Sequence, residues 1–266
     1  MSAGSSKGPL SVDEALARIL DGVTPLPSEQ VGIAEAHDRV LAEPLAAQHT
    51  QPPFDASAMD GYAGRLADLT RYPARLRVTG EAAAGCGFRG TVASGEAVRI
   101  FTGAPVPEGA DVIVIQENTT REGDIVVVGP GELDPEYIRK RGFDFEKGQV
   151  LLEDGRILNA RSVMLAAAMG HGAVRVRRRP KVALLATGDE LVLPGTPPGL
   201  DQIVCSNPFG IAAMVRGAGG DPRFVGIARD TRDSLNAKLD DARDADIVIT
   251  IGGASVGDHD LVGPVL

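Results

Sequence analysis

The chain has 266 residues, of which 43% are hydrophobic and only 4% aromatic, and its formal net charge is -9. This composition predicts one to three domains with aliphatic cores, and the acidity argues against a nucleic-acid groove, which needs clustered Lys and Arg to neutralise phosphates. Cys86 and Cys205 lack CxxC spacing, so we expect no zinc site and no disulfide framework. No stretch approaches the roughly 20 apolar residues of a membrane span, so we expect a cytoplasmic protein.

The first predicted helix lies in SVDEALARILDGV, at residues 11–23. Ser11 and Glu14 have the spacing of a capping box, and apolar residues recur behind them at helical intervals. Gly22 stands where a helix commonly ends. The sequence therefore predicts a capped amphipathic helix here, and a second helical segment over residues 31–42.

A proline-rich string, PPFDASAMDGYA, follows at residues 52–63. Its two prolines stop any helix or central strand, and the Asp60-Gly61 pair offers a tight turn. Small residues and the carboxylates of Asp55 and Asp60 fill the rest. Such a stretch cannot build a core.

Short apolar runs between Gly and Pro dominate residues 75–128 and predict a compact β domain. The runs are RLRVTG, AVRIFTG, DVIVIQEN and DIVVVG. Helix returns in NARSVMLAAAMG, with Asn159 in the cap position and Gly170 as the stop. Because helical patterns precede and follow the β runs, we interpret the β domain as an insertion in a helical linker domain.

The basic run RVRRRPK, at residues 175–181, separates this part from a new pattern. The run is consistent either with a solvated linker between domains or with a patch that steers anions. Beyond it come a strand in KVALLATGDE, a helix from Asn207, a strand in RFVGIARD, a helix in TRDSLNAKLDDARDA and a strand in DIVITIGG. This order predicts a parallel sheet with right-handed crossovers.

Open parallel sheets bind ligands beyond the carboxyl ends of their strands. Two such ends here carry polar turns, TGDEL at residues 187–191 and GGASVGDHD at residues 252–260. Gly252, Gly253 and Gly257 would let backbone N–H groups approach an anion, and Ser255 would add a hydroxyl. The alternative is an ordinary tight turn.

Four carboxylates belong to these two turns: Asp189, Glu190, Asp258 and Asp260. Grouped carboxylates repel unless a cation joins them, and oxygen ligands suit Mg²⁺, which often also contacts substrate phosphates. The alternative is that they are capping or solvated acids. Asp230 is similarly placed to be the N-cap of the following helix, and His259 is most simply a surface histidine.

Five motifs in one order resemble a single family: PPFDASAMDGYA, RIFTGAPVPEGADVIVIQEN at residues 99–118, IRKRGFDF at residues 138–145, ATGDEL and TIGGASVGDHD. Together they extend over nearly the whole chain. The sequence is similar to the molybdopterin molybdenumtransferases, called MoeA in bacteria and the E domain of gephyrin in animals.

This resemblance implies that molybdate is inserted into the dithiolene of adenylated molybdopterin with Mg²⁺, which releases AMP and forms the molybdenum cofactor. It also implies a homodimer, in which the inserted domain of one subunit closes over the sheet crevice of the other. The molybdopterin adenylyltransferase is a further expected partner. The proline-rich string would then be a rigid site loop.

Residue by residue, the resemblance implies catalytic roles for Asp60, Thr102, Asp144, Glu190 and Asp230. The expected metal-binding residues are Asp189, Glu190, Asp258 and Asp260. The residues expected to contact substrate are Ser57, Gly103, Thr187, Gly188, Asn207, Gly252, Gly253, Ser255 and Gly257.

The resemblance also implies the domain organisation, with a helical linker domain at residues 1–50 and 146–179 and an inserted β-rich domain at residues 51–145. A three-layer α/β domain with a mainly parallel sheet would occupy residues 180–266. Members of the family continue with a lysine-containing segment and a C-terminal β domain, so we expect this sequence to be C-terminally truncated. Ala56 stands where the family usually has Asn beside Ser57.

Two alternative functions remain at this stage. The related adenylyltransferase, which makes adenylated molybdopterin, uses the same sheet domain, but it lacks the inserted β domain and its glycine turn usually reads Gly-Gly-Thr-Gly. A gephyrin-like scaffold would use the fold to hold receptor tails. A long disordered linker and a fused adenylyltransferase domain would favour the scaffold, and neither occurs in these residues.

Overall fold

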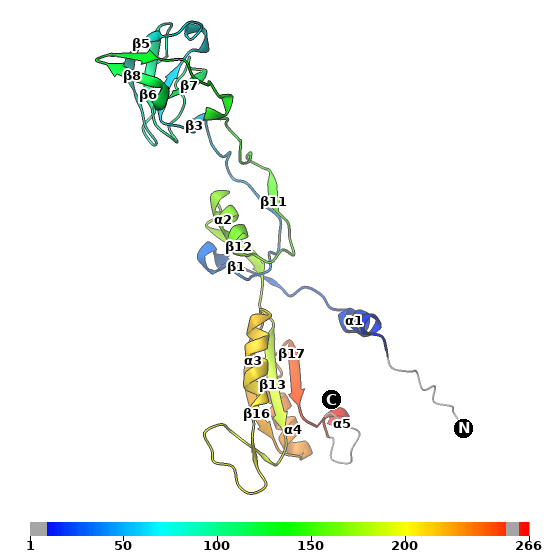
Figure 1. Ribbon diagram of the computed structural model, residues 1–266. Coiled ribbons are helices and arrows are strands. Elements are labelled where there is room, and N and C mark those ends of the chain that lie inside the picture. The colour runs from blue at the N-terminus through cyan, green and yellow to red at the C-terminus, as the bar shows by residue number, and fades with distance from the viewer. Residues whose placement is uncertain (1–9, 254–260, 266) are drawn as a thin grey trace. The chain divides into compact units, whose positions relative to one another are not determined.

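The computed structural model, whose helices and strands are labelled in Figure 1, describes residues 10–253 and 261–265. These residues divide into two compact units. The first unit comprises the described residues of Met1–Glu43, Gly155–Ala160 and Ala173–Leu266, and the second comprises Pro44–Asp154 and Arg161–Gly172. Each unit has its own hydrogen-bonded sheets. We therefore describe the two units separately.

The first unit contains a three-stranded parallel sheet in the order β16-β13-β17. Its elements are β13 (Lys181–Thr187), β14 (Leu191–Val192), β15 (Ile203–Val204), α3 (Asn207–Gly217), β16 (Asp221–Ala228), α4 (Arg232–Asp241), β17 (Ile247–Ile251) and α5 (Val262–Val265). The predicted alternation of strands and helices is confirmed. The central strand β13 is buried after its first residue, as expected for a parallel strand with a neighbour on each side.

Helices α3 and α4 both contact β16, and a core cluster forms where α4 and α5 meet the sheet. Leu185, Ala228, Leu235 and Val262 are its buried members. Strands β14 and β15, which follow β13 and precede α3 in the sequence, pair with each other in parallel. They were not predicted from the sequence. They are two residues each, too short for a recognisable period.

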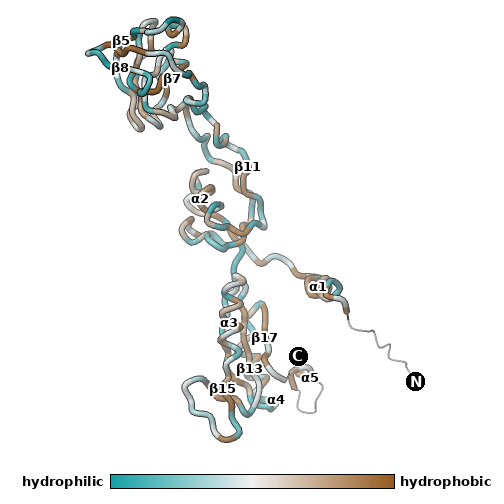
Figure 2. Tube along the Cα trace, in the orientation of Figure 1, coloured by the Kyte–Doolittle hydropathy of each residue, from teal (hydrophilic) through white to brown (hydrophobic). Residues whose placement is uncertain are grey.

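The N-terminal part of the first unit contains α1 (Val12–Leu20), β1 (Ser28–Gly32), the 3₁₀ helix η1 (Ile33–Glu35) and β12 (Ala173–Arg177). The predicted capping box is present, because Ser11 Oγ accepts from the Glu14 amide while Glu14 accepts from the Ser11 amide. No residue of α1 is buried, and its hydrophobic stretch is visible in Figure 2.

The second helix predicted in this region, over residues 31–42, is wrong. Gln30 and Val31 lie instead in β1, which pairs antiparallel with β12, and Val40 and Leu41 form bridges to Ile157 and Val176. Pairing with distant strands thus overrides the local helix propensity of this segment. Among the described residues of the expected linker domain, helix occurs in α1, in η1 and in α2 (Ala160–Ala168).

A six-stranded sheet in the order β7-β4-β6-β5-β9-β8 dominates the second unit. Its strands are β4 (Gly61–Gly64), β5 (Ala74–Ala82), β6 (Glu96–Ile100), β7 (Val112–Ile115), β8 (Thr119–Glu122) and β9 (Ile125–Val128), all antiparallel neighbours except β5 and β6. Neighbouring residues such as Tyr62 and Ala63 belong to different core clusters, so the sheet is packed on both faces.

The other elements of the second unit are short. They are β2 (Leu45–Ala46), β3 (Ala56–Ser57), η2 (Leu66–Asp68), η3 (Gln116–Asn118), η4 (Pro135–Tyr137), β10 (Ile138–Arg139), β11 (Val150–Leu152) and α2 (Ala160–Ala168), whose first residue belongs to the first unit. Helix α2 begins directly after Asn159, and Gly170 follows it with a positive φ of 99°, as the sequence predicted.

Candidate functional site

A cavity of about 440 Å³ lies in the second unit, beside the proline-rich string. We name it the loop cavity, and its lining residues are Gln51, Pro52, Pro53, Phe54, Ala56, Ser57, Ala58, Thr102, Gly103, Arg139 and Asp144. Ser57, Thr102, Gly103 and Asp144 were all selected from the sequence as candidate site residues. The structure thus brings together residues from three separate motifs.

Asp60 and Thr102 form a hydrogen-bonded pair beside the loop cavity. Oδ1 of Asp60 accepts from the Thr102 amide at 2.8 Å and from the Thr102 hydroxyl at 2.9 Å. These bonds, first the backbone one and then the side-chain one, lower the pKa of Asp60. In the part of the chain that the structure describes, no group donates to Oδ2 of Asp60, so this oxygen is available to a ligand.

The turn that carries Ser57 is fixed by its own hydrogen bonds. Ser57 Oγ donates to the carbonyl of Met59 at 2.6 Å, and the Ser57 carbonyl accepts from the Gly103 amide at 2.8 Å. Gly103 has a φ of 81°, a conformation that residues with a side chain rarely adopt. The strings containing Ser57 and Thr102 are therefore joined through their backbones.

Basic side chains at the end of β10 and directly after it complete this region, and the sequence analysis did not assign them a role. Arg139 lines the loop cavity and pairs with Asp144 at 2.7 Å. Lys140 pairs with Asp55 at 2.8 Å, and this bond, together with one from the Arg141 amide, lowers the pKa of Asp55. The sequence feature that could have indicated their role is the run Arg139 to Arg141, a cluster of cations in an acidic chain.

A second cavity, of about 250 Å³, lies in the first unit at the carboxyl ends of β13 and β17. We name it the sheet-edge cavity, and its lining residues are Ala186, Thr187, Glu190, Leu191, Ile203, Val204, Cys205, Ser206, Asn207, Pro208, Ile251 and Gly252. Thr187, Glu190, Asn207 and Gly252 were all predicted from the sequence. A parallel sheet binds ligands at this edge.

The hydroxyl of Thr187 is the strongest sign of a ligand in the sheet-edge cavity. Thr187 is only 9% exposed, and its Oγ1 has no hydrogen-bond partner among the described residues. Gly252 lies directly against it, because a Cβ on Gly252 would stand 3.0 Å from this oxygen and 2.8 Å from the Thr187 carbonyl oxygen. A buried hydroxyl without a partner is costly, and a bound polar group would satisfy it.

The acidic residues near this cavity are only partly grouped. Asp189 pairs with Arg229 at 4.0 Å and accepts from the Asp230 amide at 3.4 Å, and the carbonyl of Asp189 accepts from Arg229 at 2.8 Å. Gly188 has a φ of 146°, and the Glu190 carboxylate lies directly against it. A Cβ at position 188 would stand 2.5 Å from Oε2 of Glu190, so glycine leaves room for this carboxylate. The described residues contain no group of three His, Cys, Asp or Glu arranged to hold a metal ion.

Several predicted residues lie outside the described part of the chain. Ser255, Gly257, Asp258, His259 and Asp260 are among them, and Gly253 is the last described residue before them. The four-carboxylate metal site therefore stays a prediction. The alternative reading of Asp230 as a helix cap is wrong, because the N-cap of α4 is Thr231, whose side chain accepts from the Ser234 amide.

Two family models match this chain. One is described as the MoeA N-terminal region (domain I and II) and matches residues 10–170, and the other, described as a probable molybdopterin binding domain, matches residues 183–266. The first alone extends over more than half of the chain.

Curated relatives and solved structures agree with these matches. The molybdopterin molybdenumtransferases of Nostoc sp. and Haemophilus influenzae are 39% and 37% identical to this chain, over 90% and 97% of its residues. The chain spans 56% and 64% of the lengths of these two relatives. A crystal structure of the molybdopterin biosynthesis MoeA protein from Pyrococcus horikoshii matches 90% of this chain and 65% of its own, with a TM-score of 0.84 and 33% identity. The chain therefore belongs to the MoeA family.

Proposed function

We propose that the protein containing this chain inserts molybdate into adenylated molybdopterin, releasing AMP and completing the molybdenum cofactor. The observation that carries the proposal is the sheet-edge cavity, which lies in a region similar to a molybdopterin binding domain. Glu190, Asn207 and the Thr187 hydroxyl line it, and this hydroxyl has no hydrogen-bond partner in the described part of the chain. The names of the relatives support the same reaction.

The residues of the sheet-edge cavity would bind the pterin nucleotide. Thr187 would donate its hydroxyl to a substrate oxygen, and Asn207 would supply an amide that can both donate and accept. The apolar wall formed by Leu191, Ile203 and Val204 would exclude water from the bound substrate. Close approach of the ligand to the backbone is supported by Gly252, since only glycine fits against Thr187.

The residues of the loop cavity would act on the molybdate side. Asp60, held by Thr102 through one oxygen, would present its other oxygen to the substrate, and its lowered pKa keeps it ionised at neutral pH. Arg139 would attract the molybdate oxyanion, since it lines the cavity and carries a positive charge. Asp144, paired with Arg139, would orient that guanidinium.

Mg²⁺ fits the donor chemistry of the acidic residues, which offer carboxylate oxygens, the ligands that this ion prefers. Asp189 and Glu190 would hold it, with Asp258 and Asp260 as the further candidates. When bound, the ion would polarise the phosphate that is cleaved and neutralise the departing AMP. The carboxylates hold the metal and do not attack the substrate.

We further propose, on the resemblance, that two copies assemble as a homodimer in which each subunit contributes one of the two cavities to a shared site, and that the molybdopterin adenylyltransferase delivers the substrate. Among the described helices, none is long and apolar enough to cross a bilayer. Cytoplasmic location is part of the proposal. Light scattering of the full-length protein measures the number of subunits directly.

The test of the reaction is AMP release and cofactor formation by the full-length protein with adenylated molybdopterin, molybdate and Mg²⁺. Asp60→Ala and Glu190→Ala should each lower turnover by about 10²-fold or more. Chelation by EDTA should abolish turnover, and added Mg²⁺ should restore it. The matched control is Asp124→Ala, an exposed acid between β8 and β9 whose side chain is 93% exposed. Unchanged AMP release in both test variants would contradict the proposed site.

A further inference from the structure

Arg99 on β6 contacts two aromatic rings, that of Tyr62 on β4 and that of Phe101, the residue that follows β6. It lies directly opposite Tyr62 in the β4–β6 register. Its guanidinium carbon stands 5.1 Å from the centre of the Tyr62 ring and 4.7 Å from that of Phe101. Both distances are within the range of cation–π attraction, and a planar guanidinium can stack on such rings while its edge still donates hydrogen bonds. The aromatic contacts therefore fix the orientation of this side chain.

The hydrogen bonds of Arg99 converge on the backbone around Asp60. Nη1 donates to the carbonyl of Gly61, the next residue, at 3.1 Å. Nη2 donates to the side-chain oxygen of Gln116 at 2.7 Å. The backbone amide of Gln116 in turn donates to the carbonyl of Asp60 at 3.0 Å. Arg99 thus holds the carbonyls of two successive residues, that of Gly61 directly and that of Asp60 through Gln116.

The same chain segment also holds the Asp60 carboxylate. Thr102, three residues after Arg99, donates both of its hydrogen bonds to Oδ1. Arg99 and Thr102 therefore hold Asp60 at two points, the backbone and the carboxylate. The direction of Oδ2 depends on both points, because a shift of the Asp60 backbone would lengthen the bonds to Thr102.

We propose that Arg99 is a positioning residue for Asp60: it clamps the backbone at residues 60–61, where β4 begins, so that Oδ2 of Asp60 keeps one direction toward the substrate. This inference rests on the role of Asp60 in the proposed function. Arg99 acts through Gly61 and Gln116 and does not line the loop cavity. Its positive charge also lowers the pKa of Asp60, after the two larger contributions from Thr102.

The competing interpretation is that Arg99 only stabilises the sheet or only supplies charge. Three variants separate these roles. Arg99→Met removes both hydrogen bonds, Arg99→Lys keeps the charge but cannot stack flat and serve two acceptors, and Gln116→Ala cuts the indirect connection while Arg99 stays in place. The matched control is Arg75→Met on β5, whose 2.8 Å ion pair with Glu122 is exposed and has no hydrogen bond to the Asp60 region.

The first measurement is hydrogen exchange of single amides, which requires no substrate. The Thr102 amide, bonded to Asp60, should exchange about tenfold faster or more in Arg99→Met, because the acceptor is no longer held in place. The Val78 amide, bonded to the carbonyl of Asp124 at 2.8 Å, should be unchanged. Arg75→Met should leave the Thr102 amide as it is in the unsubstituted protein.

The second measurement is the steady-state kinetics of the full-length protein. Arg99→Met should lower kcat about tenfold or more with KM within about threefold, since a misplaced group costs rate more than binding. Arg99→Lys should remain close to Arg99→Met, whereas a purely electrostatic role predicts recovery by Lys. Gln116→Ala should fall between Arg99→Met and the unsubstituted protein.

Unchanged Thr102 exchange in both Arg99→Met and Gln116→Ala overturns the positioning role, and so does unchanged kcat in variants whose Thr102 exchange is faster. Should Arg99→Met fail to fold, Gln116→Ala decides the question alone. If Asp60→Ala keeps full turnover, the proposed role of Asp60 fails, while Thr102 exchange still shows whether Arg99 holds the backbone at residues 60–61. The two failures are therefore distinguishable.

Discussion

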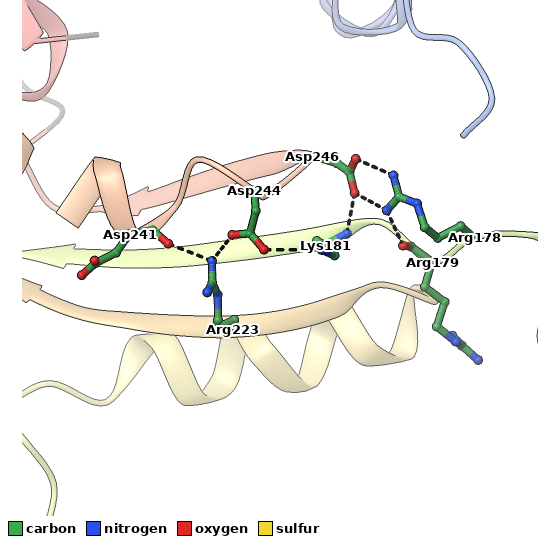
Figure 3. Close-up of polar contacts among 7 residues, drawn as sticks. All are labelled: Arg178, Arg179, Lys181, Arg223, Asp241, Asp244 and Asp246. Carbon is green, nitrogen blue, oxygen red and sulfur yellow. Dashed lines mark hydrogen bonds and ion pairs between the residues drawn. The ribbon is translucent and has the colours of Figure 1, made fainter. Parts of the chain in front are cut away.

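Arg178 donates two hydrogen bonds to the carboxylate of Asp246, at 2.7 and 2.8 Å (Figure 3). The same carboxylate accepts from the Lys181 amide at 2.7 Å. Arg178 precedes β13 and Asp246 precedes β17, so this pair joins the starts of two parallel strands that are far apart in the sequence. The cations of the basic run thus have a structural use, because Arg178 and Lys181 both bind acids near the start of β17.

Replacing Asp246 with Asn should destabilise the parallel sheet, because the bidentate pair would be lost. The hydrogen bond from Arg178, followed by that from the Lys181 amide, lowers the pKa of Asp246 well below its usual range. At neutral pH, Asp246→Asn should lower Tm by about 2–4 °C. The measurement is differential scanning calorimetry of the full-length protein from pH 3 to pH 8.

The pH dependence follows from the direction of that shift. A lowered carboxylate pKa gives stability that is fully present above the unfolded-state pKa of about 3.9 and is lost as pH falls through the folded-state pKa. The Tm difference should therefore be constant at neutral pH and shrink below about pH 4. Asp240→Asn, which breaks an exposed pair with Arg243, is the control and should change Tm by about 1 °C or less. Equal effects of the two variants would contradict the assignment.

Gly61→Ala should disrupt the sheet next to Asp60. A Cβ on Gly61 would stand 2.0 Å from the carbonyl oxygen of Val114 on the neighbouring strand, so the β4–β7 pairing must shift. We expect a loss of about 1–3 kcal/mol or more, measured by urea unfolding. Gly64→Ala, on the same strand, places its Cβ 3.5 Å from Leu76 and should cost about 1 kcal/mol or less. Gly61→Ala with unchanged stability would show that the two strands are farther apart than described.

Thr187→Val should leave the stability of the unliganded protein unchanged or raise it by about 1 kcal/mol, because the buried hydroxyl it removes has no partner among residues 10–253 and 261–265. Binding of adenylated molybdopterin should weaken by about three- to tenfold, since one hydrogen bond to the ligand would be lost. Urea unfolding and calorimetric titration measure the two effects. Thr187→Ser, which keeps the hydroxyl, should retain more of the affinity than Thr187→Val, and a clear loss of stability in Thr187→Val would reveal a partner for this hydroxyl.

Cys205 should react with iodoacetamide at least about tenfold more slowly than Cys86 in the folded protein. Cys205 lines the sheet-edge cavity, is only 4% exposed, and its burial raises the pKa of the thiol, which disfavours the reactive thiolate. Cys86 is exposed. Peptide mapping by mass spectrometry gives both rates, and Cys86→Ser isolates Cys205. Denaturant should make the two rates similar, and equal rates without denaturant would contradict the burial of Cys205.

Much of the fold was predictable because its signals are local. The capping box of α1, the start and stop of α2 and the buried run of β13 each depend on residues within one turn or one strand. The alternation of strands and helices from β13 to β17 follows from the same short-range periods. The candidate residues of both cavities could be predicted because they belong to motifs that are continuous in the sequence.

The errors came where distant pairing decides. The segment at residues 31–42 has helix-forming composition, yet its backbone donors and acceptors pair with β12 and with Arg156 and Leu158. Asp230 has the residue type of a helix cap, but Thr231 takes that position and leaves the Asp230 amide bonded to Asp189. A local window of sequence shows neither the pairing of residues 31–42 with distant segments nor the contact between Asp230 and Asp189.

The sequence by itself determined the family motifs, the alternation of the main strands and helices from β13 to β17 and the chemical types at both cavities, because these depend on residue identity and short-range spacing. Only the tertiary structure decided which groups meet: Thr102 with one oxygen of Asp60, Arg99 with the carbonyl of Gly61, and the buried Thr187 hydroxyl with Gly252. The physical reason is that these contacts join residues about 40 or more positions apart, and strand pairing and core packing, which no local pattern encodes, bring them within hydrogen-bonding distance.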